Sequence, residues 1–305
     1  MQSIESKYYK VYGYNIKSQI ELIELLEGNS KEPVDVVVEY GKVYDYIKPY
    51  IDEGKTGYFS TDECWMHVKD IAYYRILKGN KIIVEPISDD KEKIKTFILG
   101  SAFGVLLIQN NTIAIHGGAV VIDDKAIIIT GESGAGKSTL VSVFRENGYK
   151  FLSDDVSATY IGENNKLYVN PAYPQQKLCG DAVDNYKYNR SELRKLNEDR
   201  DKYAIINIKD FETTPKELYG IFQISCSDKV DKVTIKEICG VEKVGYITKN
   251  IYRINFAEIM GIKKQYLKKA IDMARNIKVY SIVRPKGEYT SEIQLDNIVR
   301  ITKHA

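Results

Sequence analysis

Residues 126–144 read AIIITGESGAGKSTLVSVF, the most informative segment of the chain about its fold. The apolar run AIIIT predicts a buried strand, and TLVSVF predicts a helix that starts directly after the glycines. Between them, GESGAGKS at 131–138 fits the pattern G-x-x-x-x-G-K-[ST] completely. Glycines let backbone N–H groups turn toward an anion, so a glycine-rich loop between a strand and a helix is typical of phosphate binding. The stretch therefore predicts an α/β fold with a P-loop.

The predicted phosphate site is a run of nine residues. It consists of Gly131, Glu132, Ser133, Gly134, Ala135, Gly136, Lys137, Ser138 and Thr139. Lys137 is expected to reach the β- and γ-phosphates of a nucleoside triphosphate, and the Ser138 hydroxyl is expected to ligate Mg²⁺. The helix that begins here adds the positive end of its dipole. ATP and Mg²⁺ are the predicted ligands.

A P-loop alone does not distinguish motors, GTPases, transporters and kinases, because all of them carry one. The class of protein must therefore be inferred from polar residues elsewhere in the sequence. Asp154 and Asp155 follow the strand-like segment 150–152. Carboxylates in that position hold Mg²⁺ or take a proton from the nucleophile. The alternative is that the two aspartates form an exposed acidic turn without a functional role. His116 follows the run IAI and precedes two glycines. It is either a packing residue or part of the site.

The order of elements predicts two domains. Short strand-like runs separated by turn signals fill residues 1–88, which predicts a small β-rich domain with one short helix over 18–26. Residues 89–305 alternate strands with helices and form the predicted P-loop domain. Its predicted elements are a helix over 91–109, strands over 112–115, 119–122, 126–130, 150–152, 158–161, 166–169, 218–225 and 232–237, helices over 137–147, 241–248 and 256–276, and a closing strand over 278–283. The charged segment 186–202 predicts either a solvated helix or a mobile substrate loop.

Composition argues against several kinds of binding partner, metal site and cellular location. The net charge of +2 gives no electrostatic reason to expect nucleic acid or an anionic membrane as a partner. The four cysteines lie far apart and without neighbouring histidines, which argues against structural zinc. The N-terminal MQSIESKYYK lacks the apolar core of a signal peptide, and no apolar run is long enough to span a membrane. We expect a soluble cytoplasmic protein.

Taken together, His116-Gly117, the loop at 131–138 and Asp154-Asp155 resemble the catalytic domain of HPr kinase/phosphorylase in their order and spacing. Lys137 follows His116 by 21 positions, and Asp155 follows Lys137 by 18. The chain is more similar still to HPr-kinase-like proteins found beside peptide-modifying enzymes, including the lasso-peptide kinases that phosphorylate a precursor peptide, and that similarity extends over nearly its whole length. The similar stretches are YKVYGYNIKSQIEL, VDVVVEYGKV, FILGSAFGVLLIQ, IAIHGGAVV and NPAYPQQKL.

The resemblance implies a role for each site residue. Asp155 would deprotonate the acceptor hydroxyl, His116 would lie near the transferred phosphoryl group, and Lys137 would stabilise its charge. Asp154 is the predicted second metal contact. The implied acceptor is a Ser or Thr hydroxyl of a precursor peptide or small protein, and a homo-oligomer stays open. Weaker candidates for substrate or phosphate contacts, for each of which an ordinary surface charge is the favoured interpretation, are Lys177, Arg200 and Lys202.

Two alternatives remain open from the sequence. One is a kinase for a small-molecule hydroxyl, and the other is a nucleotide-dependent regulatory protein with little turnover. The sequence also departs from the bifunctional enzymes. Where those carry a glutamate-containing signature after the acidic pair, residues 171–183 read PAYPQQKLCGDAV and contain no glutamate. This predicts a protein that phosphorylates without an efficient phosphate-dependent reverse reaction.

Overall fold

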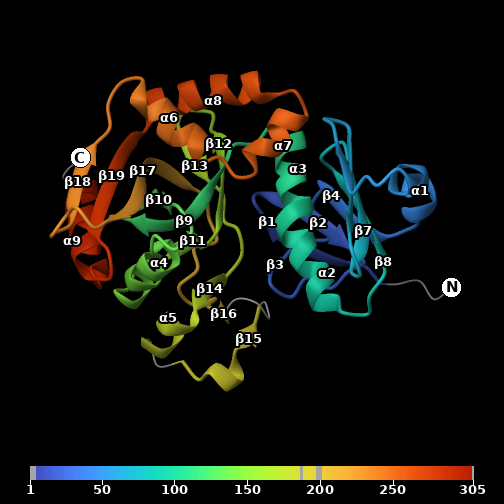
Figure 1. Cartoon of the computed structure of the whole chain (residues 1–305), viewed down its shortest axis with the longest axis horizontal. Helices are drawn as coiled ribbons and strands as arrows, with labels where there is room; N and C mark the ends of the chain where they lie inside the picture. The colour runs from blue at the N-terminus through green and yellow to red at the C-terminus, as the bar shows by residue number, and fades with distance from the viewer. Residues whose placement is uncertain (1–4, 186–187, 197–200, 304–305) are drawn as a thin grey trace. The chain divides into compact units, whose positions relative to one another are not determined.

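The structure, a computed structural model, describes residues 5–185, 188–196 and 201–303 (Figure 1). Contacts between residues divide the chain into two compact units, and the chain passes between them three times. The units comprise Met1–Ile113 with Tyr252–Lys268, and Ala114–Ile251 with Lys269–Ala305.

The division between the units differs from the boundary predicted at residue 88. The helical segment that follows residue 88 packs on the first sheet, where the Tyr74 hydroxyl donates to the carbonyl of Ile94 at 3.1 Å. The rings of Tyr74 and Phe97 also lie in contact. The predicted helix over 91–109 therefore belongs to the first unit.

One mixed sheet of eight strands forms the first unit, in the order β3-β1-β2-β4-β8-β7-β6-β5. Its strands carry most of the runs predicted for residues 1–88. They are β1 (Lys7–Val11), β2 (Tyr14–Ser18), β3 (Leu26–Glu27), β4 (Val36–Tyr40), β5 (Gly57–Phe59), β6 (Glu63–Val68), β7 (Ala72–Leu77) and β8 (Lys81–Pro86).

The helices of the first unit include one long continuous segment, which is charged at its start and apolar in α3. Residues 91–109 are helical throughout, as predicted, but residues 98–102 at the centre form a π-helical turn. Six of the seven residues of α3 are buried, which is typical of a helix enclosed by its domain. The helices are α1 (Tyr44–Asp52), α2 (Lys91–Phe97), the π segment (Ile98–Ala102), α3 (Phe103–Gln109) and α7 (Ile254–Ile259).

The short helix predicted over 18–26 is wrong. β2 ends at Ser18, and the chain then runs through turns to β3. The Ser18 hydroxyl accepts from the Ile20 N–H at 3.0 Å and donates to the Ile20 carbonyl at 2.6 Å. Such local bonds offer the backbone an alternative to helical bonding. α1 was not predicted, since Pro49 lies inside it.

The second unit contains the glycine-rich loop and two sheets. The larger sheet runs β10-β9-β12-β13-β17-β19-β18, with β11 paired to β9 and β10 also paired to β17; the smaller runs β14-β16-β15. The strands are β9 (Ala114–Ile122), β10 (Lys125–Gly131), β11 (Phe151–Ser153), β12 (Val156–Ile161), β13 (Leu167–Val169), β14 (Gln175–Cys179), β15 (Arg194–Lys195), β16 (Lys202–Ile206), β17 (Lys216–Ser227), β18 (Thr234–Glu237) and β19 (Lys278–Pro285). The helices are α4 (Lys137–Glu146), α5 (Gly180–Asn185), a 3₁₀ turn (Arg190–Glu192), α6 (Glu242–Lys249), α8 (Lys263–Asn276), which begins in the first unit, and α9 (Ser291–Lys303).

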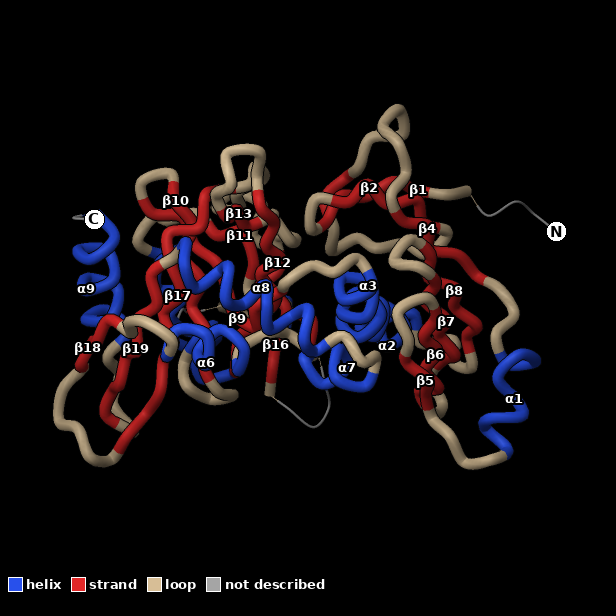
Figure 2. Tube along the Cα trace, turned by 90° about the horizontal axis from the view of Figure 1, so that it is seen from above, coloured by secondary structure: helices blue, strands red, loops and turns tan. Residues whose placement is uncertain are grey.

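Three parallel strands place the glycine-rich loop. β17 is parallel to both β10 and β19, so all three end at the same edge of the sheet. Figure 2 labels the three strands among the red segments of this unit. In this register Gly131 lies opposite Ile224, and Ile224 lies opposite Ile282. The isoleucines and alanine of β10 are fully buried, which explains the uninterrupted apolar run in the sequence.

Three further expectations for the second unit need correction. The strands predicted at 112–115 and 119–122 are one strand, β9, which runs through Gly117 and Gly118. The helix predicted over 256–276 is two helices, because Gly261 adopts a left-handed conformation with φ of +75° and caps the first of them. Within 186–202, the described residues form a 3₁₀ turn and the short strand β15 rather than a solvated helix. α9 was not predicted.

No helix within the described ranges combines the length and the apolar content needed to cross a lipid bilayer.

Gly131→Ala should destabilise the protein more than the same substitution at a glycine with open space around it. Gly131 has φ of +145°, and a Cβ there would overlap the Ile224 carbonyl oxygen on β17. The control is Gly148→Ala, at φ of +84° with no atom within 4 Å of the added carbon. We expect a loss in free energy of unfolding of roughly 1–2 kcal/mol for Gly148→Ala and of about 3 kcal/mol or more for Gly131→Ala, measured by urea unfolding. Equal losses would show that β10 and β17 do not approach as closely as described.

Candidate active site

The glycine-rich loop connects β10 to α4, as the sequence predicted. Gly134 and Gly136 have φ of +83° and +104°, values that residues with a side chain rarely adopt. Lys137 is the first residue of α4, and its ammonium donates to the carbonyls of Gly131 at 2.9 Å and Glu132 at 3.0 Å. The lysine head thus lies over the start of the loop. Ser138 and Thr139 follow it in the first turn of α4.

Arg284 of β19 fixes the loop from the neighbouring strand. Its Nε donates to the Ala135 carbonyl at 3.1 Å, and its Nη1 donates to the Pro285 carbonyl at 3.1 Å. This contact could not be predicted from the sequence, because Arg284 follows the loop by more than a hundred residues. Only the parallel register of β10, β17 and β19 brings the two together.

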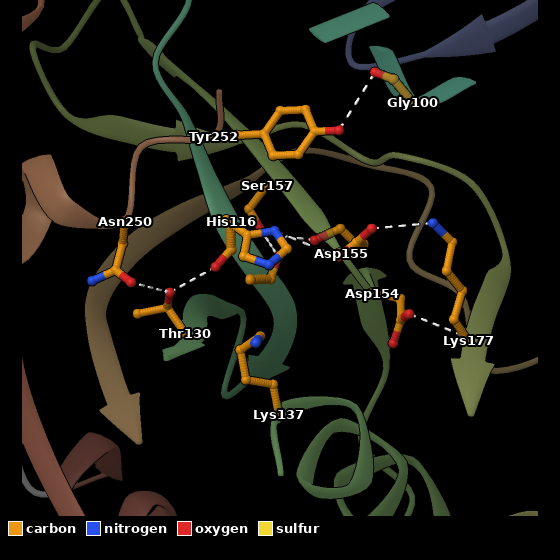
Figure 3. A network of polar contacts seen from close by, with 12 residues as sticks. Gly100, His116, Thr130, Lys137, Asp154, Asp155, Ser157, Lys177, Asn250 and Tyr252 are labelled. Atoms are coloured by element: carbon orange, nitrogen blue, oxygen red, sulfur yellow. Dashed lines mark hydrogen bonds and ion pairs between the residues drawn. The ribbon is translucent and has the colours of Figure 1, made fainter. Parts of the chain in front are cut away.

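His116 and the acidic pair meet across neighbouring strands. His116 lies opposite Val156 in the pairing of β9 with β12, and the Gly117 N–H donates to the Asp155 carbonyl at 2.9 Å. Nδ1 of His116 therefore lies 3.5 Å from Oδ1 of Asp155 (Figure 3). The structure brings together the two residues that the sequence could only relate by spacing.

Lys177 of β14 contacts both carboxylates. Its ammonium is 3.1 Å from Oδ2 of Asp155, and its backbone N–H donates to Oδ2 of Asp154 at 2.9 Å (Figure 3). The sequence suggested Lys177 as a substrate contact; in the structure it is a partner of the acidic pair.

The two aspartates have opposite electrostatic environments. Asp154 is 6% exposed, and its Oδ1 is buried with no hydrogen-bond partner among the described residues. Burial raises the pKa of Asp154 to about 7, and the negative charge of Asp155 contributes to the same shift. Burial would also raise the pKa of Asp155, but opposing interactions, the charge of Lys177 first among them, outweigh it and hold that pKa below its usual value. Asp155 is thus ionised at neutral pH.

Burial and the neighbouring charges also shift the pKa values of His116 and Lys137. Burial lowers the pKa of His116 against the opposing charge of Asp155, which leaves the imidazole neutral at pH 7. Burial also lowers the pKa of Lys137, and Asp155 opposes that shift. The charge of Lys202, at the start of β16, lowers the pKa of Lys137 further. These linked shifts place Lys202 within electrostatic reach of the site, whereas Arg200 lies outside the described residues.

The backbone of His116 is held by residues that the sequence analysis missed. The Thr130 hydroxyl donates to the His116 carbonyl at 2.6 Å and lies 2.9 Å from Oδ1 of Asn250 (Figure 3). The His116 N–H donates to the Asn250 carbonyl at 2.7 Å. Thr130 could have been noticed as the polar end of AIIIT. Asn250 carries no motif.

The residues present fit a magnesium ion that arrives with a nucleotide. The described residues contain no group of three His, Cys, Asp or Glu side chains that could hold a metal unaided. Mg²⁺ is usually bound through one or two carboxylates, with phosphates and water as its other ligands. The unpartnered Oδ1 of Asp154 and the hydroxyl of Ser138 are oxygen donors of the kind that it prefers.

The fold and the site define a mixed α/β protein in which a glycine-rich strand–loop–helix segment accompanies a His–Asp–Lys cluster. No model of a known protein family matches the sequence, and no curated protein matches it. Among solved structures, the chain is similar to the Hpr(Ser) kinase/phosphatase from Coxiella burnetii, with a TM-score of 0.34 and 15% sequence identity. The match covers 62% of this chain and 95% of that one.

Asp154→Asn should stabilise the nucleotide-free protein at pH 8, and by progressively less as the pH falls towards 4. A folded-state pKa of about 7, above the usual 3.8, means that the native state binds the extra proton between these values. The contribution of Asp154 to stability therefore falls as pH rises from about 4 to about 7. We expect a gain on the order of 1–3 kcal/mol at pH 8, measured by urea unfolding.

Asp155→Asn is the matched control for this experiment, since the pKa of Asp155 is lowered. The charge of Asp155 stabilises the fold above pH 4, and that contribution is lost as pH falls through the folded-state pKa. Its substitution should therefore lower stability at pH 8. The same sign for both variants would contradict the opposite environments of the two carboxylates.

Proposed function

We propose that this protein is an ATP-dependent kinase that transfers the γ-phosphoryl group to a Ser or Thr hydroxyl of a precursor peptide or small protein. The observation that carries the proposal is Asp155, held ionised by Lys177 beside His116, in electrostatic contact with Lys137 of the glycine-rich loop. An ionised carboxylate near a phosphate-binding lysine is the arrangement that phosphoryl transfer to an alcohol requires. The peptide or protein acceptor is supported by the sequence resemblance alone.

In this mechanism Asp155 accepts the proton of the acceptor hydroxyl. The hydroxyl oxygen forms a bond to the γ-phosphorus, the bond from that phosphorus to the β–γ bridging oxygen breaks, and ADP leaves with the electron pair. Bound Mg²⁺, on Ser138 and Asp154, would neutralise charge on the β- and γ-phosphates.

Lys137 and His116 assist the transfer in different ways. Lys137 and the loop N–H groups stabilise the charge of the equatorial oxygens. A neutral His116 can donate a hydrogen bond without adding a charge. Lys177 keeps Asp155 ionised and oriented, which is a positioning role.

Two substitutions should separate nucleotide binding from turnover. Lys137→Ala should abolish the concentration-dependent rise in melting temperature that Mg²⁺–ATP causes, because a ligand stabilises only the state that binds it. Asp155→Asn should keep this thermal shift and lower the transfer rate by roughly 10²–10⁴-fold, because asparagine keeps the shape and loses the base. Lys166→Ala, which removes an exposed lysine paired with Glu217, serves as the control and should change neither. A wild-type shift in Lys137→Ala would refute the loop as the nucleotide site, and near-normal transfer by Asp155→Asn would refute the base.

The reaction should run forward far more readily than in reverse. Residues 171–183 contain no glutamate, and both glutamines there are bound to arginines. Oε1 of Gln176 accepts from Arg145, and Oε1 of Gln175 accepts from Arg194 at 3.1 Å. This segment therefore offers no counterpart of the glutamate that helps the bifunctional enzymes to position metal while inorganic phosphate attacks.

Incubation of the phosphorylated acceptor with Mg²⁺ and millimolar phosphate, followed by assay for pyrophosphate, tests this direction. We expect release well below the forward rate. Release at a comparable rate would contradict the prediction and favour HPr as the substrate.

A further inference from the structure

A cavity of about 230 Å³ opens beside the end of the glycine-rich loop. It touches the last loop residue and the first turn of α4, and it continues to the segment between β19 and α9. The lining residues that matter here are Gly136, Thr139, Asp181, Arg284, Tyr289 and Gln294.

Gln294, in the wall of this cavity, carries a buried polar atom that has no hydrogen-bond partner among the described residues. Its side chain is 2% exposed, and its Nε2 donates to the Thr290 hydroxyl at 3.1 Å. Its Oε1 is buried and accepts no hydrogen bond from any described residue. Buried polar atoms are almost always bonded, so an orphaned acceptor in the wall of a cavity indicates a donor supplied by a ligand.

The position of the cavity indicates what kind of ligand this is. Phosphates held by the loop N–H groups would end near Gly136 and Thr139, where the rest of a nucleotide must leave the loop. Tyr289 is 60% exposed and lines the cavity, so its ring is available to stack on a base. The carboxylate of Asp181, also in the wall, can accept from ribose hydroxyls.

We propose that this cavity is the nucleoside subsite and that Gln294 selects adenine. Oε1 of Gln294 accepts from the exocyclic amino group of the base. Guanine carries an oxygen acceptor at that ring position, which would oppose the acceptor of Gln294. The inference rests on the proposed function, because it requires a triphosphate in the glycine-rich loop.

The experiment compares three probes in the presence of Mg²⁺: ADP, GDP and inorganic tripolyphosphate, titrated by calorimetry. We expect wild type to bind ADP about tenfold more tightly than GDP, the difference that one hydrogen bond supplies. Gln294→Leu should remove that preference and leave tripolyphosphate affinity unchanged.

A second variant keeps the test decisive if the buried substitution at Gln294 does not fold. Tyr289→Ala should weaken ADP and GDP alike by roughly tenfold and should not affect tripolyphosphate. Tyr160→Ala, at an exposed tyrosine that does not line the cavity, is its control and should change nothing.

Each contrary result points to a different failure. Equal affinities for ADP and GDP in wild type, or no effect of Tyr289→Ala, would overturn the subsite and leave the phosphate loop intact, provided that tripolyphosphate binds. Binding of none of the three probes would overturn the subsite together with the proposed function.

Discussion

The double contact of Lys177 with the acidic pair is the interaction on which the candidate site depends. Its N–H fixes Asp154 and its ammonium fixes Asp155, so one residue orients two adjacent carboxylates. β14, which carries Lys177, is held in turn by α4. The buried Arg145, near the end of α4, donates to Gln176, the neighbour of Lys177. One helix therefore begins at the glycine-rich loop and ends by anchoring the strand that orders the carboxylates.

This arrangement gives two neighbouring aspartates different chemistry. Asp154 is buried and its pKa is raised, so without a cation its charge is costly. Asp155 is paired and its pKa is lowered, so it stays ionised. Titratable groups whose environments push their pKa values apart are typical of acid–base and metal sites. A bound metal cation would offset the free-energy cost of the buried charge on Asp154. The carboxylate of Asp155 would remain available to take the proton of the acceptor hydroxyl.

The sequence predicted what is local and missed what the tertiary structure assembles. The strand, the loop and the helix at 126–146 follow from apolar periodicity and glycine spacing, which act over a few residues. Arg284 and Asn250 could not be found, because only strand register and packing bring them to the loop and to His116. Lys177 was noticed as a cation, but its partners were not. The errors at 18–26 and at Gly261 have a similar origin, since a serine side-chain bond and a glycine cap override a helical pattern.

A crystal structure with Mg²⁺ and a non-hydrolysable ATP analogue is the decisive experiment for the proposed site. We expect the triphosphate in the loop at 131–138 and the metal on Ser138 and Asp154. We also expect the γ-phosphate within hydrogen-bond reach of Lys137, with room for a hydroxyl between that phosphate and Asp155. A γ-phosphate that points away from Asp155, or a nucleotide bound elsewhere on the chain, would contradict the proposed site.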